Sequence, residues 1–514
     1  MQKLLHIGYL TGRSVQRDPV GWLIGLAALV LLFLLGWRAV SLVDNYDGAS
    51  FNLPYAARVA GICASDCLQL IPWLENRFDH IPKFGHYLFA GVWLLTGSAS
   101  ATGLVNFLSL VLLIVYLALV FRVHWGLTAL ALIAVPFVRI PAVNFSPDLL
   151  PNVLVVLGVF TVLAYVLHPK AFSRWHAVFG LLAVAAASAT KLQVYPVAIL
   201  AIGLFGLVMF YRHFRQIPNA FSFPATAPAR VLAALAMVLV LAFASSWQIR
   251  NAVVYSNPLY PISVTVLGVE LPGRQIDRVT LSAPHIDNPP LVRWAASVFE
   301  YRAYDQRAWP WSDSQGHVSH DAWSFRIGGF YGVYVMLLLL FLGYLLCYYT
   351  QPAYRWKILG FMGLFTLFFM FLPASYYLRY NIWWMLLLVG VTLIVAGPAF
   401  KGAVGQRTEV LALFRGAVIA CCLASLLLTG FRYVTPSNFM SVERWVEARG
   451  TVSELQGHMG PDDVVCVRQR MAIYYARVFI EGAQHTTVQV SPQHSRRMSD
   501  ERIREHYGCT YLAK

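Results

Sequence analysis

Apolar runs of about 16 to 24 residues recur along most of this 514-residue chain. A helix needs about 20 such residues to cross the hydrocarbon core of a bilayer, because each residue advances it by only about 1.5 Å. The composition agrees, since 58% of the residues are apolar and only 12% are charged. The sequence therefore predicts a polytopic all-α membrane protein with eleven spans, at roughly 20–43, 101–121, 125–140, 149–167, 176–190, 192–211, 230–249, 328–349, 357–373, 381–399 and 409–430.

Three apolar stretches are too short for a simple crossing. The segments 125–140 and 176–190 could be tilted or re-entrant, because each has fewer than the roughly 20 residues that a straight span needs. The stretch 84–97 is expected to lie in the membrane interface rather than to cross.

The distribution of basic residues sets the expected orientation. The N-terminal segment and every second loop after it hold fourteen Lys and Arg residues against two acidic residues, an excess typical of cytoplasmic loops. The opposite loops, 44–86 and 251–327, hold nine basic and twelve acidic residues. We therefore expect these loops and the tail, 431–514, to face away from the cytoplasm. The net charge of +15 then reflects topology, and nucleic acid is not an expected partner.

The chain is expected to divide into a transmembrane domain, 1–430, and a small extracytoplasmic α/β domain, 431–514. In the tail, short strands are predicted near 463–467, 487–490 and 508–512, with a helix near 470–479. Four cysteines fall on the outer side, and they permit two disulfides but equally fit free thiols: Cys63, Cys67, Cys466 and Cys509.

Charged residues also lie where predicted spans meet the outer side, at Arg38, Arg139, Asp148, Lys191, Arg250 and Arg379. An ionisable group beside lipid is a functional-site candidate, and a group of cations at one membrane face suits a ligand that is both lipid and anion. Snorkelling of the side chain toward the surface is the alternative. It is sufficient for Arg38 and Arg139, and it competes with a functional role for Lys191.

Three carboxylates share this outer face. Asp44 and Asp47 follow the first predicted span directly, and Asp148 precedes the fourth. A carboxylate held at this place can take a proton from a hydroxyl group. The alternative is that each carboxylate caps the helix that follows it, since Asp is a favoured N-cap residue.

The order of these motifs resembles the GT-C superfamily of integral membrane glycosyltransferases, particularly the bacterial branch similar to protein mannosyltransferases and aminoarabinose transferases. The likeness covers residues 1–430. It departs from the family at Phe51-Asn52, where Tyr-His would be expected. The motifs that carry it are Asp47-x-x-Ser-Phe-Asn-Leu-Pro, Asp148 before the fourth span, Lys191 after an Ala/Ser-rich span, Arg250-Asn251 followed by Asn-Pro-Leu-Tyr-Pro, and Leu378-Arg379-Tyr380.

The resemblance implies transfer of a sugar, with inversion, from a polyprenyl-phosphate donor to a hydroxyl group of a lipid, glycan or protein acceptor. The location would be the bacterial inner membrane, with the active site facing the periplasm. Asp47 would be the general base, with Asp44 the second candidate, and Asp148 would position the acceptor or help bind a divalent cation. The residues that would bind the substrate and its departing phosphate are Lys191, Arg250, Asn251, Arg379 and Tyr380.

The loop 251–327 is long and rich in aromatic residues, including Trp309-Pro310-Trp311. We expect it either to cover the active site as a lid or to anchor the chain in the interface. His317, His320 and Asp321 lie close together, but three such residues without further spaced ligands do not predict a metal site.

Two other functions fit a chain of this type. An O-antigen ligase or polymerase would be expected to carry its key His and Arg in one large late loop. A transporter of lipids or glycans would be expected to have polar groups or broken helices near the middle of the bilayer. Convergence of Asp47, Asp148 and the basic residues on one outward cavity with a lipid groove would favour the transferase.

Overall fold

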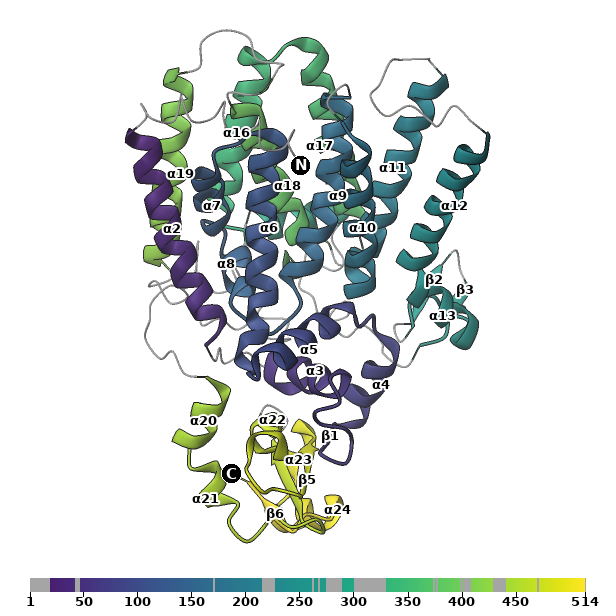
Figure 1. Cartoon of the computed structure of the whole chain (residues 1–514), viewed down its shortest axis with the longest axis vertical. Helices are drawn as coiled ribbons and strands as arrows, with labels where there is room; N and C mark the ends of the chain where they lie inside the picture. Colours follow the sequence, from purple (N-terminus) through teal and green to yellow (C-terminus); the bar gives the residue numbers. More distant parts are fainter. Residues whose placement is uncertain are drawn as a thin grey trace.

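The computed structural model describes residues 19–41, 47–169, 172–214, 227–260, 263–266, 269–273, 289–299, 330–372, 375, 378–397, 400, 408–428, 441–468 and 471–513. Long helices form one body, a layer of short helices lies at one end of it, and a small sheet domain lies beyond that layer (Figure 1). Asp44 and most of the loop 251–327, including Trp309, Trp311, His317, His320 and Asp321, fall outside the described residues.

Within the described residues, seven helices are long and apolar enough to cross a membrane, and two bent helix pairs raise the number to nine if each pair is one span. The seven are α2 (Pro19–Ala39), α6 (Leu104–Phe121), α9 (Leu149–Leu167), α11 (Tyr195–Phe214), α16 (Gly332–Tyr349), α17 (Pro352–Phe371) and α19 (Thr408–Leu428). The bent pairs are α7 (Trp125–Ile133) with α8 (Pro136–Ala142), at 95°, and α12 (Ala227–Ala244) with α13 (Ser246–Tyr255), at 58°.

All eleven predicted spans coincide with helical segments, and among the described residues seven to nine of them qualify as spans by length and composition. The difference lies in α10 (Arg174–Thr190), with 17 residues, and α18 (Ile382–Ala396), with 15. Both are shorter than the roughly 20 residues of a full crossing. Every residue of α18 is buried, so this helix lies inside the bundle, beside α9. Helices that are apolar on all sides are typical of such central positions.

The bend between α7 and α8 explains why the third predicted span, 125–140, is short. Pro136 begins α8, and Val135 before it is extended, because proline disfavours the helical conformation in the preceding residue. Arg139 donates from Nη1 to the Ile133 carbonyl, at 3.4 Å, next to the break. The snorkelling explanation for Arg139 is wrong, since its side chain is buried completely inside the protein.

The short-helix layer comes from the predicted outer loop 44–86 and the stretch 84–97 after it, and it contains η1 (Gly48–Asn52), α3 (Leu53–Val59), β1 (Leu68–Gln69), α4 (Pro72–His80) and α5 (Phe84–Thr96). With 13 residues, α5 is too short to cross a bilayer. It buries Phe89 and Trp93 and exposes Tyr87, Leu94 and Leu95. This amphipathic pattern fits the expected interfacial position.

The described part of the tail contains five short helices, one 3₁₀ turn and three strands: α20 (Val442–Ala448), α21 (Thr451–Glu454), β4 (Val464–Arg468), α22 (Ala472–Tyr475), η6 (Arg477–Phe479), β5 (Thr486–Val490), α23 (Pro492–Arg497), α24 (Asp500–Tyr507) and β6 (Tyr511–Leu512). The strands predicted in the tail are thereby confirmed. The predicted helix near 470–479 is shorter, because it divides into α22 and η6.

The sheet of the tail also contains a strand that the sequence analysis did not predict. Its order is β1-β5-β4-β6 and all neighbouring strands are parallel, so the first outer loop supplies one edge. In this pairing Leu68 lies opposite Thr487, and Gln69 lies opposite Val488. The α/β domain is therefore joined to the transmembrane domain by backbone hydrogen bonds as well as by its linker.

Both pairs of outer cysteines form disulfides, Cys63–Cys67 and Cys466–Cys509. Cys63–Cys67 closes a turn directly before β1. Cys466–Cys509 joins β4 to the segment that leads into β6. Disulfides persist in oxidising compartments, which agrees with an extracytoplasmic position for both.

The Cys466–Cys509 disulfide should stabilise the sheet domain. It closes a segment of 43 residues, and a loop of this length corresponds to roughly 4 kcal/mol of lost chain entropy in the unfolded state. We expect Cys509→Ser to lower the urea concentration at which a protease first cleaves 441–513. Cys347→Ser removes an exposed free thiol and serves as the control. Equal protease resistance of the Cys509→Ser protein and the unmodified protein would contradict the expectation.

Candidate active site

Asp47 is placed by an unusual helical turn. It precedes η1, a π-helix that runs through Gly48–Asn52 and continues into α3. Short π-helical turns are rare and are frequent at functional sites. The Asp47 side chain makes no capping hydrogen bond to this turn. Its carboxylate is 2% exposed and forms an ion pair with the Arg379 guanidinium.

Asp148 lies in a loop that a buried asparagine holds in place. Asn106, on α6, donates to the carbonyls of Asn144 and Ser146, at 3.0 and 2.8 Å, and accepts from the Leu150 amide. Asn106 therefore satisfies two carbonyls of this buried loop and the Leu150 amide that follows it. The Ser146 hydroxyl donates to Asp148 Oδ2 at 2.8 Å. Asn106 stands in an otherwise apolar run, and this was the sequence signal that could have identified it.

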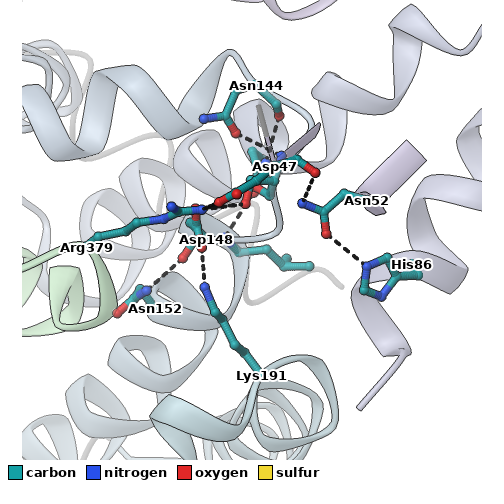
Figure 2. A network of polar contacts seen from close by, with 11 residues as sticks. Asp47, Asn52, His86, Asn144, Asp148, Asn152, Lys191 and Arg379 are labelled. Atoms are coloured by element: carbon teal, nitrogen blue, oxygen red, sulfur yellow. Dashed lines mark hydrogen bonds and ion pairs between the residues drawn. The ribbon is translucent and has the colours of Figure 1, made fainter. Parts of the chain in front are cut away.

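Lys191 and Arg379 complete the cluster around Asp148 (Figure 2). Lys191, at the end of α10, pairs with Asp148 Oδ1. Arg379, in the 3₁₀ turn η5 (Leu378–Tyr380), donates from Nε to Asp148 Oδ2 at 2.7 Å. The Lys191 ammonium also lies 4.9 Å from the centre of the Tyr380 ring, within cation–π range.

The cluster of Asp47, Asp148, Lys191 and Arg379 contains two negative and two positive charges. The Asp148 side chain is 2% exposed, and that of Arg379 is 6% exposed. Buried carboxylates that lie close together repel each other unless cations pair with them. Arg379 touches both carboxylates and therefore compensates this repulsion directly.

These contacts decide between the alternatives left by the sequence. Asp148 occupies the N-cap position of α9 but makes no side-chain cap hydrogen bond, and the same is true of Asp47 at η1. The capping explanation is thus wrong for both carboxylates. Lys191 does not snorkel freely, since its side chain is 15% exposed and paired with Asp148. Asp44, the second candidate base, lies outside the described residues.

Arg250 and Asn251 belong to a second group of polar residues, in the middle of α13. Arg250 is exposed and donates to the Asp79 carbonyl at 3.3 Å. Asn251 is buried and donates to the carbonyls of His80 and Tyr260, at 3.3 and 2.9 Å. Asn251 therefore fastens α13 and the segment after it to α4, which is a structural role.

Lys83, between α4 and α5, lies close to this second group. Lys83 lies 3.9 Å from the ring centre of Phe78 and 5.7 Å from that of Trp247, and Arg250 lies 5.3 Å from Trp247. Partial burial lowers the pKa of Lys83, and Arg250 adds to this effect while Asp79 opposes it. Nothing in the sequence singled out Lys83, because basic and acidic residues are nearly balanced in the loops of this face.

His86 is a further residue that the sequence analysis missed. Asn52 donates to the Asp47 carbonyl at 3.0 Å, and its side-chain oxygen lies 3.1 Å from His86 Nε2 (Figure 2). Burial, reinforced by the charges of Arg77 and Lys83, lowers the pKa of His86 to about 3. The imidazole is therefore neutral near pH 7. A histidine from α5 thus stands beside the position where the resemblance led us to expect a histidine in the motif itself.

The approach of α5 to the cluster depends on a glycine. A Cβ atom added at Gly85 would lie 2.9 Å from the Thr190 side chain and 3.0 Å from that of Pro147. These two residues directly precede Lys191 and Asp148. Glycine is therefore required where α5 packs against both segments that carry the ion pairs.

The comparisons with known proteins do not assign the chain to a family. No protein-family model matches it, and no curated protein matches it significantly. The likeness to the GT-C superfamily therefore depends on the order of motifs alone.

The structure leaves two expectations about the site without support. Among the described residues, no group of three or more His, Cys, Asp or Glu side chains could hold a metal ion. A small apolar pocket lies between α9, α10 and α11, but its lining contains none of the predicted site residues. Four of the predicted residues converge, yet this pocket is not the outward cavity that was expected beside them.

Arg379 should contribute strongly to stability. Arg379→Met would leave Asp47 and Asp148 buried without the guanidinium between them, and breaking a buried ion pair in this way costs about 3–5 kcal/mol. We expect a clear fall in the thermal unfolding temperature in detergent. Arg250→Met, at an exposed arginine of the same membrane face, should change it little. An equal fall in the unfolding temperature of the two variants would show that the buried ion pairs do not stabilise the protein more than an exposed arginine does.

Proposed function

We propose that the chain is a GT-C-like membrane glycosyltransferase that transfers a sugar from a polyprenyl-phosphate donor to an acceptor hydroxyl on the outer side of the membrane. The observation that carries the proposal is the meeting of Asp47, Asp148, Lys191 and Arg379 at one end of the bundle. They come from four separate segments, and the resemblance implied a role in this chemistry for each of them. The proposed location is the periplasmic face of a bacterial inner membrane.

In the proposed reaction, the acceptor oxygen attacks the anomeric carbon of the donor sugar from the face opposite the phosphate. The new bond to the acceptor forms as the bond to the phosphate oxygen breaks, which inverts the anomeric centre. Asp47 accepts the proton of the hydroxyl group, and the bonding electron pair leaves with the phosphate. Asp148 holds Lys191 and Arg379 in place at this centre.

The basic residues support the leaving group. Negative charge grows on the phosphate oxygen during the reaction, and fixed cations in a site of low dielectric stabilise it. Lys191 and Arg379 belong to the buried cluster, while Lys83 and Arg250 lie together around Trp247. A phosphate bound to Arg379 would compete with Asp47 for the guanidinium. A carboxylate released from such a pair is a stronger base, so donor binding would activate Asp47.

Apolar surface on the same layer suits a lipid-linked donor. Helix α5 exposes Leu94 and Leu95, and α13 exposes Val253 and Val254. Exposed apolar side chains on short helices at the end of a membrane bundle are typical of helices that lie in the interface. A polyprenyl chain in the bilayer would then present its phosphate at the level of the basic residues. The acceptor can be a lipid, a glycan or a protein.

Transport of a lipid-linked sugar is the second candidate function. The observation in its favour is the 95° break between α7 and α8, beside the fully buried Arg139. Broken helices and buried charges are typical of transporter binding sites. Purified protein in vesicles with labelled donor separates the two functions. Movement of intact donor between leaflets, with no new glycoside, would favour transport.

The transferase proposal predicts a large effect of Asp47→Asn. Loss of a general base lowers kcat by about 10²- to 10⁴-fold, whereas folding should persist because Arg379 keeps its pair with Asp148. The measurement is sugar transfer by purified protein from a panel of polyprenyl-phosphate sugars, with mass spectrometry of the acceptors.

Asp462→Asn, at an exposed acid of the tail, is the matched control and should retain full activity. If the Asp47→Asn protein remains folded and transfers sugar at the normal rate, Asp47 is not the base.

A further inference from the structure

The tail domain touches the turn that carries Asp47. Gln489, near the end of β5, donates from Nε2 to the Ser50 carbonyl at 2.7 Å. Its Oε1 accepts from the Ile71 amide at 3.4 Å. Gln489 is 1% exposed and Ser50 is completely buried, so these are contacts within the protein interior. One side chain of the tail thus joins η1 to the segment between β1 and α4.

Several contacts fix the position of β5, and with it Gln489. The Thr487 amide donates to the Cys67 carbonyl at 2.9 Å, and the Thr486 hydroxyl donates to the Asp66 carbonyl at 2.8 Å. Arg477 donates to the Asp66 carboxylate at 2.5 Å, and this bond lowers the pKa of Asp66. The parallel pairing of β1 with β5 begins at the next residue, Leu68. The register of the two strands is therefore set on both sides of Cys67.

A second contact connects the tail to α5. The ring of Phe479 stacks on that of Trp93, with centres 5.8 Å apart and an interplanar angle of 7°. Helix α5 also carries His86, which contacts Asn52 at the end of η1. The tail therefore reaches the turn of Asp47 from two directions. Figure 1 shows the tail directly against the layer that contains α3, α4 and α5.

We propose that Gln489 is a positioning residue, through which the tail domain holds η1 in the conformation that directs Asp47 toward Arg379. This inference rests on the proposed function, because it assigns the tail a part in the same site. Ser50 lies three residues after Asp47 in one short helical turn, so a displacement of its carbonyl moves the Asp47 carboxylate. Displacements of about 1 Å at catalytic groups can lower rates roughly a hundredfold.

The decisive variant is Gln489→Glu. A glutamate has nearly the same shape and can still accept from the Ile71 amide, but its ionised carboxylate cannot donate to the Ser50 carbonyl and repels it. Protonation restores a donor, and burial beside a carbonyl raises the pKa of a glutamate above its ordinary value of about 4.3, so that it gains its proton at a higher pH. The defect relative to the unmodified protein should therefore diminish from about pH 8 to about pH 5. Gln484→Glu, at an exposed glutamine of the same domain, introduces the same charge as a control.

The first measurement is hydrogen–deuterium exchange on the full-length protein in detergent. We expect the amides of 48–56 to exchange faster in Gln489→Glu than in the unmodified protein or in Gln484→Glu, while β4 and β5 keep their protection. Unchanged exchange at 48–56 would overturn the proposal, whatever the activity. If the glutamate destabilises the tail and β4 loses protection, Gln489→Met, which has a similar length without charge, provides the same comparison.

The second measurement is sugar transfer. We expect kcat of the Gln489→Glu protein to fall roughly tenfold to a hundredfold at about pH 8 with little change in KM for the donor, since η1 would move the base but not the phosphate site. Faster exchange together with unchanged kcat would overturn the positioning role. Faster exchange in a chain whose unmodified form transfers no sugar would instead refute the proposed function and leave the contact between tail and η1 established.

Discussion

The pairing of Arg379 with both Asp47 and Asp148 is the interaction on which the organisation of the outer end depends. Arg379 joins segments that are 332 and 231 residues apart in the chain. Each partner lies on a different support: a π-helical turn, a loop held by Asn106, and a 3₁₀ turn before α18. All three side chains are buried, so each charge needs its partner nearby. The three segments can therefore keep these positions only when all of them are in place. The fold of the first loop and the packing of the bundle are thus coupled by electrostatics.

Many residues of this cluster could be predicted, because charged side chains are unusual next to the apolar segments of a membrane protein. Ionisable residues at the ends of apolar runs stand out, which is why Asp47, Asp148, Lys191 and Arg379 could be selected individually. Their pairing could not, since contacts across hundreds of residues leave no trace in local periodicity. Arg250 shows the limit of the approach. It shares the same sequence signal, but it lies exposed beside Asp79 rather than in the buried cluster.

The elements that sequence patterns failed to indicate are small or depend on distant partners. Strand β1 has two residues, too few for an alternating pattern, and it is a strand only because β5 lies beside it. His86 is similar, since its importance derives from its contact with Asn52 and from its burial. The number of spans shows a related limit, since the sequence predicts eleven and the described residues support seven to nine by length and composition. Helices such as α18, inside the bundle, are apolar on every side without being long enough to cross.

The β1–β5 pairing also has a consequence for biosynthesis. Ile71 and Gln489 are 418 residues apart, and ribosomes add about 5–20 residues per second, so the first outer loop waits roughly 20–80 seconds for its partner strand. During that interval every spanning helix can already be inserted, while the turn of Asp47 lacks its support from the tail. A chain that stops before β5 would resemble the finished protein in the membrane but would leave a strand edge open to proteases.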